Sequence, residues 1–316
     1  MIKKQKRWGK KIFYLRDWKD INEMHIQRAT FYLDFDWVAC WSTELAEMNK
    51  GKRGAPYQFP NSLIHLQAVW LNFFSYRGAE GITRKFVSFG LLPEYNDYST
   101  IQRRVIDMDL DIPKPESKEI FVATDGSGIK MNMSGEYFEQ MYGKGERKKF
   151  IKAVISADPF TKDVLKVEVS LEGEGDSEPE IAEKHMSELI NEGNIINEFF
   201  GDGSFDTHTL FDFCDQHKIK PVIKIRESAD PDAEGSWRRS MEVKKYKKLG
   251  YKKWAKQNNY GRRWTGTEGI FSAVKKIYGE RVRAHIIENM CIEAKRKFWA
   301  YQRMKRYAEE KMALAG

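Results

Sequence analysis

The chain has 316 residues, 41% of them hydrophobic and 13% aromatic, so it can bury one or two sizeable cores and is neither fibrous nor disordered. Its 54 Lys and Arg residues exceed its 46 Asp and Glu residues, and the formal net charge of +8 permits a polyanionic partner without identifying one. The three cysteines are widely separated, which argues against a disulfide framework or a zinc site and points to a reducing compartment.

The N-terminal segment is basic, but neither an apolar run nor a small-residue cleavage site follows it, and no stretch approaches the length of a membrane helix. We therefore expect a cytoplasmic protein without a membrane partner, in which residues 1–55 form a basic arm and a helical region. Residues 231–263 hold eleven Lys and Arg against three acids, and residues 270–316 hold eleven against five. A DNA-binding surface is therefore expected in the C-terminal third.

Residues 56–115 have the pattern of a helical region. Apolar side chains recur at helical spacing in its first part, a second short helix follows, and a third begins where Asp97 or Ser99 can cap it. Arg103 and Arg104 are expected to project outward from that third helix. Three short helices with paired arginines predict a helix-turn-helix-like DNA-binding region, although a plain helical bundle with a solvated face fits nearly as well.

After a proline-containing boundary at residues 113–117, the hydrophobic period changes from helical to strand-like. Residues 116–290 follow the order strand, strand, strand, helix, strand, helix, strand, helix, with a basic insertion at 231–263. Three antiparallel strands extended by two right-handed crossovers predict an α/β fold with an RNase-H-like, five-stranded mixed sheet flanked by helices. The predicted strands cover residues 120–125, 150–158, 164–171, 198–202 and 221–226, and the predicted helices cover 179–193, 207–217, 265–279 and, at the C-terminus, 291–316.

Acidic residues end two of the predicted strands. Asp125 closes the first strand and is followed by Gly-Ser-Gly, and Asp202 closes the fourth strand between two glycines. In the predicted topology these strands are neighbours, so their terminal carboxylates can share a metal ion. Mg²⁺ prefers such hard oxygen ligands and retains waters, so two or three carboxylates suffice for a two-metal site.

Glu268 is the candidate for a third carboxylate. It lies in the first turn of the predicted helix at 265–279, on the margin of the apolar arc, and Lys275 shares that edge two turns later. Glu268 can then supply a third metal ligand, with Lys275 meeting a phosphate nearby. Each acid also has a plain structural interpretation, because Asp-Gly pairs form turns and a Glu in a first turn favours the helix dipole. Their joint occurrence in this topology favours the metal site.

Five groups of segments, spanning most of the chain, occur in a recognisable order. They are KRGAPYQFPNSLIHLQAVWLNFFSYRGAEG with DYSTIQRRV, then VATDGSGIK, then RKKFIKAVISAD with VLKVEVSLEGEGDS, then FFGDGSFDT, and finally RRWTGTEGIFSAVKKIYG with ENMCIEAKRKFWAYQRMK. Together they resemble the DDE transposases of bacterial and archaeal insertion sequences. The resemblance implies that Asp125, Asp202 and Glu268 are the catalytic, metal-binding acids.

The resemblance also implies an activity and partners. It predicts a DNA transposase that uses Mg²⁺, for which Mn²⁺ can substitute, to cut transposon ends and transfer them to target DNA. The implied partners are terminal inverted repeats and target DNA, bound by a homodimer, with no small-molecule substrate. Tyr260, Arg263 and Lys275 match the family's Tyr, Arg and Lys around the catalytic Glu. Arg263 precedes Glu268 by five residues where the family has about four, so its match is looser than that of Lys275.

Further residues carry more than one interpretation. Lys130 can contact a phosphate or be solvated, Arg262 is another DNA-binding candidate, and Asp206 is expected to cap the following helix. Three tryptophans along the basic stretch can stack on bases or form a small core. Two alternatives to a transposase remain open: a metal-dependent nuclease or resolvase with the same fold would share the acids, and a domesticated, non-catalytic relative would keep only the basic surface.

Overall fold

The computed structural model describes residues 18–131, 149–230, 232 and 235–315. The chain forms two compact units, residues 1–34 with 304–316 and residues 35–303. The described part of the first unit consists of α1 (Trp18–Thr30), the short helix η1 (Phe31–Leu33) and the end of α13 (Ile287–Ala315). The basic arm predicted near the N-terminus falls mostly on residues 1–17, outside the described residues. None of the described helices is long and apolar enough to span a bilayer.

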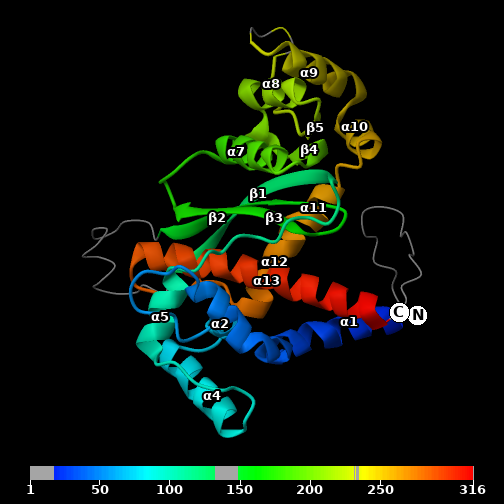
Figure 1. Ribbon diagram of the computed structural model, residues 1–316. Coiled ribbons are helices and arrows are strands. Elements are labelled where there is room, and N and C mark those ends of the chain that lie inside the picture. Colours follow the sequence, from blue (N-terminus) through cyan, green and yellow to red (C-terminus); the bar gives the residue numbers. More distant parts are fainter. Residues whose placement is uncertain (1–17, 132–148, 231, 233–234, 316) are drawn as a thin grey trace, which may run out of the picture. The chain divides into compact units, whose positions relative to one another are not determined.

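The larger unit contains a helical N-terminal part, a mixed sheet and the helices that cover that sheet (Figure 1). The helices before the sheet are η2 (Asp36–Cys40), α2 (Trp41–Asn49), α3 (Asn61–Trp70), α4 (Tyr76–Ser88) and α5 (Tyr98–Ile106). The strands are β1 (Glu119–Met131), β2 (Phe150–Ala157), β3 (Val164–Leu171), β4 (Ile195–Gly201), β5 (Lys220–Ile223) and β6 (Arg281–Val282). The other helices are α7 (Glu178–Asn191), η3 (Gly203–Phe205), α8 (His208–Gln216), α9 (Trp237–Leu249), α10 (Tyr251–Gln257), α11 (Arg262–Gly266), α12 (Glu268–Tyr278) and the part of α13 up to residue 303.

The sheet has the strand order β3-β2-β1-β4-β5. The first three strands in the chain pair antiparallel, and β4 and β5 are added parallel to β1 through crossovers that contain α7 and α8. This arrangement confirms the predicted RNase-H-like mixed sheet. A sixth strand, β6, pairs parallel with the end of β1 and was not predicted, because two residues leave no alternating pattern in the sequence.

Strand pairing is continuous along one edge of β1 and interrupted along the other. Along the first edge, β2 pairs with every residue from Ala123 to Lys130. Along the second edge, β4 pairs up to Ala123 and β6 pairs from Lys130 onward, and within the described residues no strand pairs there with Thr124 to Ile129. We call this interval the β1 window. The prediction that the strand ends at Asp125 is wrong, because β2 continues to hold β1 after β4 has ended.

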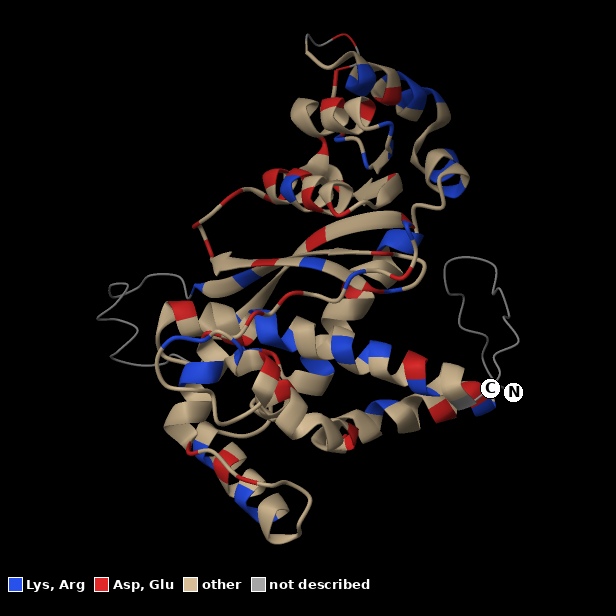
Figure 2. Ribbon diagram, in the orientation of Figure 1, with Lys and Arg blue, Asp and Glu red and all other residues tan. Residues whose placement is uncertain are grey.

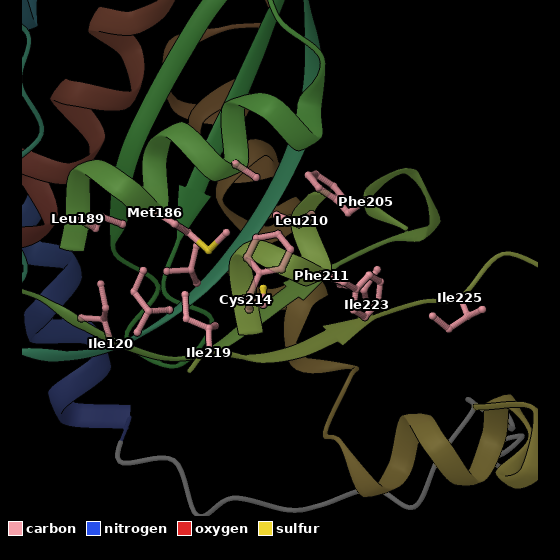
Figure 3. Packing of buried hydrophobic residues seen from close by; sticks show 14 of the residues in the cluster. Ile120, Met186, Leu189, Phe205, Leu210, Phe211, Cys214, Ile219, Ile223 and Ile225 are labelled. Atoms are coloured by element: carbon pink, nitrogen blue, oxygen red, sulfur yellow. The ribbon is translucent and has the colours of Figure 1, made fainter. Parts of the chain in front are cut away.

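The main hydrophobic core lies between the sheet and helices α7 and α8 (Figure 3). In this core Ile120 and Val122 of β1 belong to one cluster with Met186 and Leu189 of α7 and Leu210 of α8. Burying an aliphatic side chain of this size contributes about 1.5–3 kcal/mol. The cluster therefore fixes α7 and α8 on this face of the sheet.

A second cluster covers the opposite face of the sheet, with buried members Ala123, Phe200, Val222, Trp254 and Tyr260. Successive strand residues point to opposite faces, so Asp125 shares this second face with Ala123, whereas Thr124 points toward α7. Hydrogen bonds support this assignment, because the hydroxyl of Thr124 contacts that of Ser156, which contacts His185 of α7. Residues 124 and 125 thus direct their side chains to opposite faces of the β1 window.

The basic insertion predicted at residues 231–263 folds mainly as α9 and α10, whose ribbons carry many Lys and Arg positions (Figure 2). Its exposed lysines are Lys244, Lys245, Lys247, Lys248, Lys252, Lys253 and Lys256. Val243 and Trp254 are buried, so these helices keep an apolar side in the core and turn their lysines to solvent. Trp254 is 2% exposed and belongs to a small core, as one interpretation of the tryptophans expects, whereas Trp237 is 66% exposed and its stacking on bases stays a prediction.

The helices predicted within residues 56–115 form as α3, α4 and α5. Asp97 caps α5, as expected, and accepts hydrogen bonds from the first free amides of that helix. Arg103 is exposed, but Arg104 donates hydrogen bonds to the Phe59 carbonyl at 3.2 Å and to Asn61 Oδ1 at 2.7 Å. The expectation that both arginines project outward is therefore wrong for Arg104, which connects α5 to the start of α3.

Lys297 of α13 joins three successive parts of the structure. Its buried ammonium donates hydrogen bonds to the carbonyls of Tyr278 at 2.9 Å, Gly279 at 3.0 Å and Arg281 at 2.6 Å. Burial lowers the pKa of Lys297 to about 8. Because these carbonyls belong to the end of α12 and the start of β6, Lys297 fixes both elements to α13.

Asp206 forms a buried ion pair and does not cap α8 as expected, since Thr207 caps that helix. The Asp206 carboxylate accepts hydrogen bonds from Arg239 Nε at 2.6 Å, from Arg239 Nη2 at 3.1 Å and from the Arg226 amide at 3.0 Å. Its side chain is 0% exposed and that of Arg239 is 10% exposed. The pair therefore holds α9 against the segment that follows β4.

Replacing Asp206 with Asn should lower the free energy of unfolding by about 3–5 kcal/mol, because the Arg239 guanidinium would stay buried without its counter-charge. Chemical denaturation followed by circular dichroism measures the loss. The matched control is Lys184→Gln, which breaks an exposed pair with Glu168 and should cost about 1 kcal/mol or less. Equal losses in the two variants would contradict the stabilising role of the buried pair.

Candidate active site

Asp125 lies in the β1 window, and three neighbours hold its carboxylate. Oδ1 accepts a hydrogen bond from the Gly126 amide at 2.9 Å. Oδ2 accepts hydrogen bonds from Arg263 Nη1 at 3.1 Å and from Thr267 Oγ1 at 3.2 Å. The Arg263 side chain is 5% exposed, so the ion pair is largely shielded from water and connects α11 to β1.

The electrostatic environment of Asp125 is unfavourable for its charge. Burial raises the pKa of Asp125, Arg263 opposes that rise, and the nearby charge of Asp202 adds to it. A carboxylate that is both desolvated and repelled by another acid requires a compensating cation. In this structure the Arg263 guanidinium provides that charge.

Asp202 follows the last residue of β4 and begins the turn η3. Its Oδ1 accepts hydrogen bonds from the amide and the hydroxyl of Ser204, at 2.7 and 2.5 Å. The turn is tight, because a Cβ on Gly201 would lie 2.8 Å from the Cβ of Phe205. Since β4 pairs with β1 up to Ala123, Asp202 leaves the sheet at the edge of the β1 window. The predicted side-by-side position of the first and fourth strands is confirmed.

Glu268 is the first residue of α12 and is exposed. Partial burial raises its pKa, the charge of Asp125 raises it further, and Arg263 opposes both effects. Glu268 is therefore within electrostatic reach of Asp125. Farther along α12, Lys275 Nζ donates a hydrogen bond to Ser127 Oγ at 2.8 Å. The edge of α12 that carries these two residues thus faces the β1 window.

A fourth acid, Glu178, lies beside the same window and was not singled out from the sequence. It is the first residue of α7. Burial raises its pKa, Lys152 opposes the rise, and the charges of Asp125 and Asp202 add to it. In the sequence Glu178 has the form of an ordinary first-turn acid. No local pattern indicates its position, which depends on how α7 crosses β1.

The four acids offer the carboxylate oxygens that hard divalent cations prefer. Repulsion within the group contributes to the raised pKa of Asp125, Glu178 and Glu268, and a cation among them would relieve it. In their present arrangement, the described residues contain no group of three or more His, Cys, Asp or Glu side chains that could hold a metal ion. The donor chemistry fits a divalent cation, while the Asp125 carboxylate is engaged by Arg263.

Three residues expected to bind DNA lie at the surface. Lys130 is exposed and pairs with Glu280 at 2.8 Å, and Arg262 is exposed with its guanidinium 5.1 Å from the centre of the Phe160 ring. Arg103 is exposed on α5. Exposed pairs of this kind contribute little to stability, so these cations can exchange their present contacts for a phosphate.

Tyr260, by contrast, is an interior residue. It is 3% exposed, its ring is 5.0 Å from that of Trp254, and its hydroxyl donates a hydrogen bond to the Gly201 carbonyl at 3.2 Å. Burial raises the pKa of Tyr260 to about 12. In this structure the Tyr260 side chain supports the end of β4, directly before Asp202, and the contact with DNA expected for it stays a prediction.

Tyr260→Phe should lower the free energy of unfolding by about 0.5–1.5 kcal/mol at neutral pH, because the Gly201 carbonyl loses its donor. In the unfolded chain Tyr260 ionises near pH 10 and in the folded protein near 12. The unfolded state therefore releases its proton first, so the advantage of the wild type over the variant should shrink as the pH rises from 10 toward 12.

Denaturant unfolding at several pH values measures both effects. The control is Tyr251→Phe, at a residue that is 47% exposed, where a change within about 0.5 kcal/mol is expected. If the two variants lose stability equally at neutral pH, the hydroxyl of Tyr260 does not support β4.

Comparisons with known proteins identify the family of this arrangement. A family model described as a transposase DDE domain matches residues 116–302, and a second model with the same description matches residues 26–134. Three solved structures are similar. The piggyBac transposase synaptic complex with hairpin DNA has 13% sequence identity and a TM-score of 0.34, and the match covers 91% of this chain and 78% of that chain. The Mos1 strand transfer complex has 8% identity and a TM-score of 0.28, with 84% of this chain and 81% of that chain covered, and the Drosophila P element transposase strand transfer complex has 12% identity and a TM-score of 0.30, with 83% and 68% covered.

The family assignment rests on the sequence models, because the structural likenesses are distant. The match at residues 116–302 covers more than half of the chain and spans the sheet from before β1 to α13. It therefore includes Asp125, Asp202 and Glu268 in the order predicted from the sequence. The chain belongs to the DDE transposases and is a DNA transposase, an enzyme that cleaves and rejoins DNA phosphodiester bonds.

Proposed function

We propose that Asp125, Asp202 and Glu268 bind the divalent metal ions of this transposase and that Mg²⁺ is the metal used, with Mn²⁺ able to substitute. The observation that carries this proposal is the approach of these acids to the β1 window from three elements. Asp125 comes from the part of β1 where pairing along one edge is interrupted, Asp202 follows the end of β4, and Glu268 begins α12. The influence of Asp202 on the pKa of Asp125, and of Asp125 on the pKa of Glu268, supports a shared site.

The bound metal ions would activate a water or a 3′-hydroxyl and stabilise the leaving oxygen of an in-line displacement at phosphorus. The protein residues fix the donors for that chemistry. Hydrogen bonds from Gly126 and Ser204 orient the carboxylates of Asp125 and Asp202. The contact between Lys275 and Ser127 holds α12, and therefore Glu268, beside β1.

Arg263 has a second role in this proposal. It is buried and supplies the positive charge that Asp125 otherwise lacks. A divalent cation at Asp125 would compete with Arg263 for Oδ2, and the guanidinium would become available to the negative charge of a DNA phosphate. Lys275 is partly buried beside the window and can meet the same phosphate.

We place the main DNA-binding surface on α9 and α10, with further contacts from Arg103, Lys130 and Arg262. The seven exposed lysines of these two helices support this assignment, because phosphate contacts made by Lys and Arg dominate nonspecific DNA affinity. The substrates would be the inverted repeats at the ends of the transposon and a target duplex, bound by a homodimer. A cytoplasmic location agrees with the three free cysteines.

Replacing Asp125 with Asn should reduce both cleavage and joining of transposon ends by about 10³-fold or more, since metal coordination contributes several kcal/mol to such transition states. Asp202→Asn and Glu268→Gln should behave alike. The measurement incubates the protein with labelled DNA from the flanks of its gene, a target plasmid and Mg²⁺. DNA affinity, measured by fluorescence anisotropy, should be unchanged or slightly higher.

The control substitution for this assay is Glu280→Gln, which removes an exposed acid paired with Lys130 and should leave both rates near those of the wild type. Full cleavage by Asp125→Asn would refute the metal assignment. Cleavage by the wild type without any joining would instead indicate a nuclease.

A double variant Lys252→Gln/Lys253→Gln should weaken DNA binding and reduce the steepness of its salt dependence. Each lost phosphate contact is expected to lower the slope of log K against log[salt] by about 0.9, so the pair should lower it by about 2. The charge-matched control is Lys114→Gln/Lys118→Gln, two exposed lysines before β1. If only the control pair changes the slope, the DNA surface lies elsewhere.

A further inference from the structure

Glu178 has an unusual place for a first-turn acid. Its neighbour Ser177 and the acid two positions later, Glu180, form the capping box that starts α7. Glu180 is therefore the acid that caps the free backbone amide at the start of α7. Glu178 is left with a different set of neighbours, which include Gly126 of β1 and Lys152 of β2.

The carboxylate of Glu178 occupies the space above Gly126. A Cβ added to Gly126 would lie 2.4 Å from Glu178 Oε1 and 3.0 Å from its Cδ, so any larger residue at position 126 would displace it. Gly126 is in turn the residue whose amide donates to Asp125. The absence of a side chain at 126 thus lets the carboxylate approach the backbone directly beside Asp125.

Charge interactions connect Glu178 to the same acids as the proposed metal site. Burial raises the pKa of Glu178, and the charges of Asp125 and Asp202 add to that rise, as the charge of Asp125 does for Glu268. Lys152 compensates incompletely, because its Nζ lies 3.9 Å from Glu178 Oε1. Glu178 therefore shares the electrostatic environment of Asp125, as Glu268 does.

The β1 window explains how acids from both faces of the sheet can reach one place. Glu178 is the first residue of α7 and Glu268 is the first residue of α12, and these two helices lie on opposite sides of the sheet (Figure 1). An intact parallel neighbour beside Thr124 to Ile129 would separate these faces, but β4 ends before that interval and β6 begins after it. Acids from the two faces can therefore meet at the open edge of β1, beside Asp125.

We propose that Glu178 is a fourth carboxylate of the cation site, contacting the metal from the α7 face while Glu268 contacts it from the opposite face. This inference rests on the proposed function, because it assumes that Asp125 and Asp202 bind divalent cations. It adds a ligand from a helix that the other three acids do not use. It also gives a reason for a glycine at position 126.

The test measures metal binding without DNA or turnover. Mn²⁺ is titrated into the full-length protein, and free Mn²⁺ is quantified by electron paramagnetic resonance. Glu178→Gln, which keeps the size of the side chain, should weaken Mn²⁺ binding by about 10-fold or more. The control is Glu180→Gln in the same helical turn, which retains a capping-box side chain and should bind Mn²⁺ like the wild type.

Two further variants make the outcomes distinguishable. Asp125→Asn tests the proposed function itself and should also weaken binding, and Gly126→Ala should weaken it by displacing Glu178, with circular dichroism checking that each variant is folded. If Glu178→Gln binds Mn²⁺ like the wild type while Asp125→Asn does not, the inference about Glu178 is overturned and the proposed site stands. If Asp125→Asn also binds like the wild type, both are overturned.

Discussion

The burial of Asp125 beside an interruption in the sheet is the constraint on which the site depends. A charge at that position is desolvated and repelled by Asp202, so it requires a cation nearby. Arg263 meets this requirement within the protein, and a divalent metal would meet it during catalysis. The same interruption gives side chains from both faces access to Asp125. The early end of β4 thus gives access to Asp125, while burial and the charge of Asp202 make the charge of Asp125 unfavourable.

The elements around this interruption are held by hydrogen bonds and packing that do not involve the four acids. Tyr260 supports the end of β4, and the hydrogen bond from Lys275 to Ser127 sets α12 against β1. On the other face, the apolar cluster around Met186 fixes α7. Each acid is thus placed by packing that extends well beyond the site, as precise orientation of metal ligands requires.

Much of the sheet could be predicted because its strands alternate or form apolar runs of ordinary length, as β3 does. The three acids can be singled out because they follow or precede such elements and match a family pattern, and their metal-binding role stays a prediction. The continuation of β1 past Asp125 could not, since the Gly-Ser-Gly sequence resembles a turn and only pairing with β2 makes it a strand. The buried position of Tyr260, the contacts of Arg104 with the start of α3, and the approach of Glu178 to Gly126 depend on tertiary packing that leaves no local pattern.

Lys297 helps to position Glu268 although it lies far from the acids in the sequence. Its three hydrogen bonds hold the end of α12, whereas Glu268 is at the beginning of the same helix, ten residues earlier. A helix transmits displacement along its axis with little bending, so a shift at its anchored end would move the carboxylate at the other. A substitution at Lys297 on α13 would therefore shift Glu268 without changing any residue next to it.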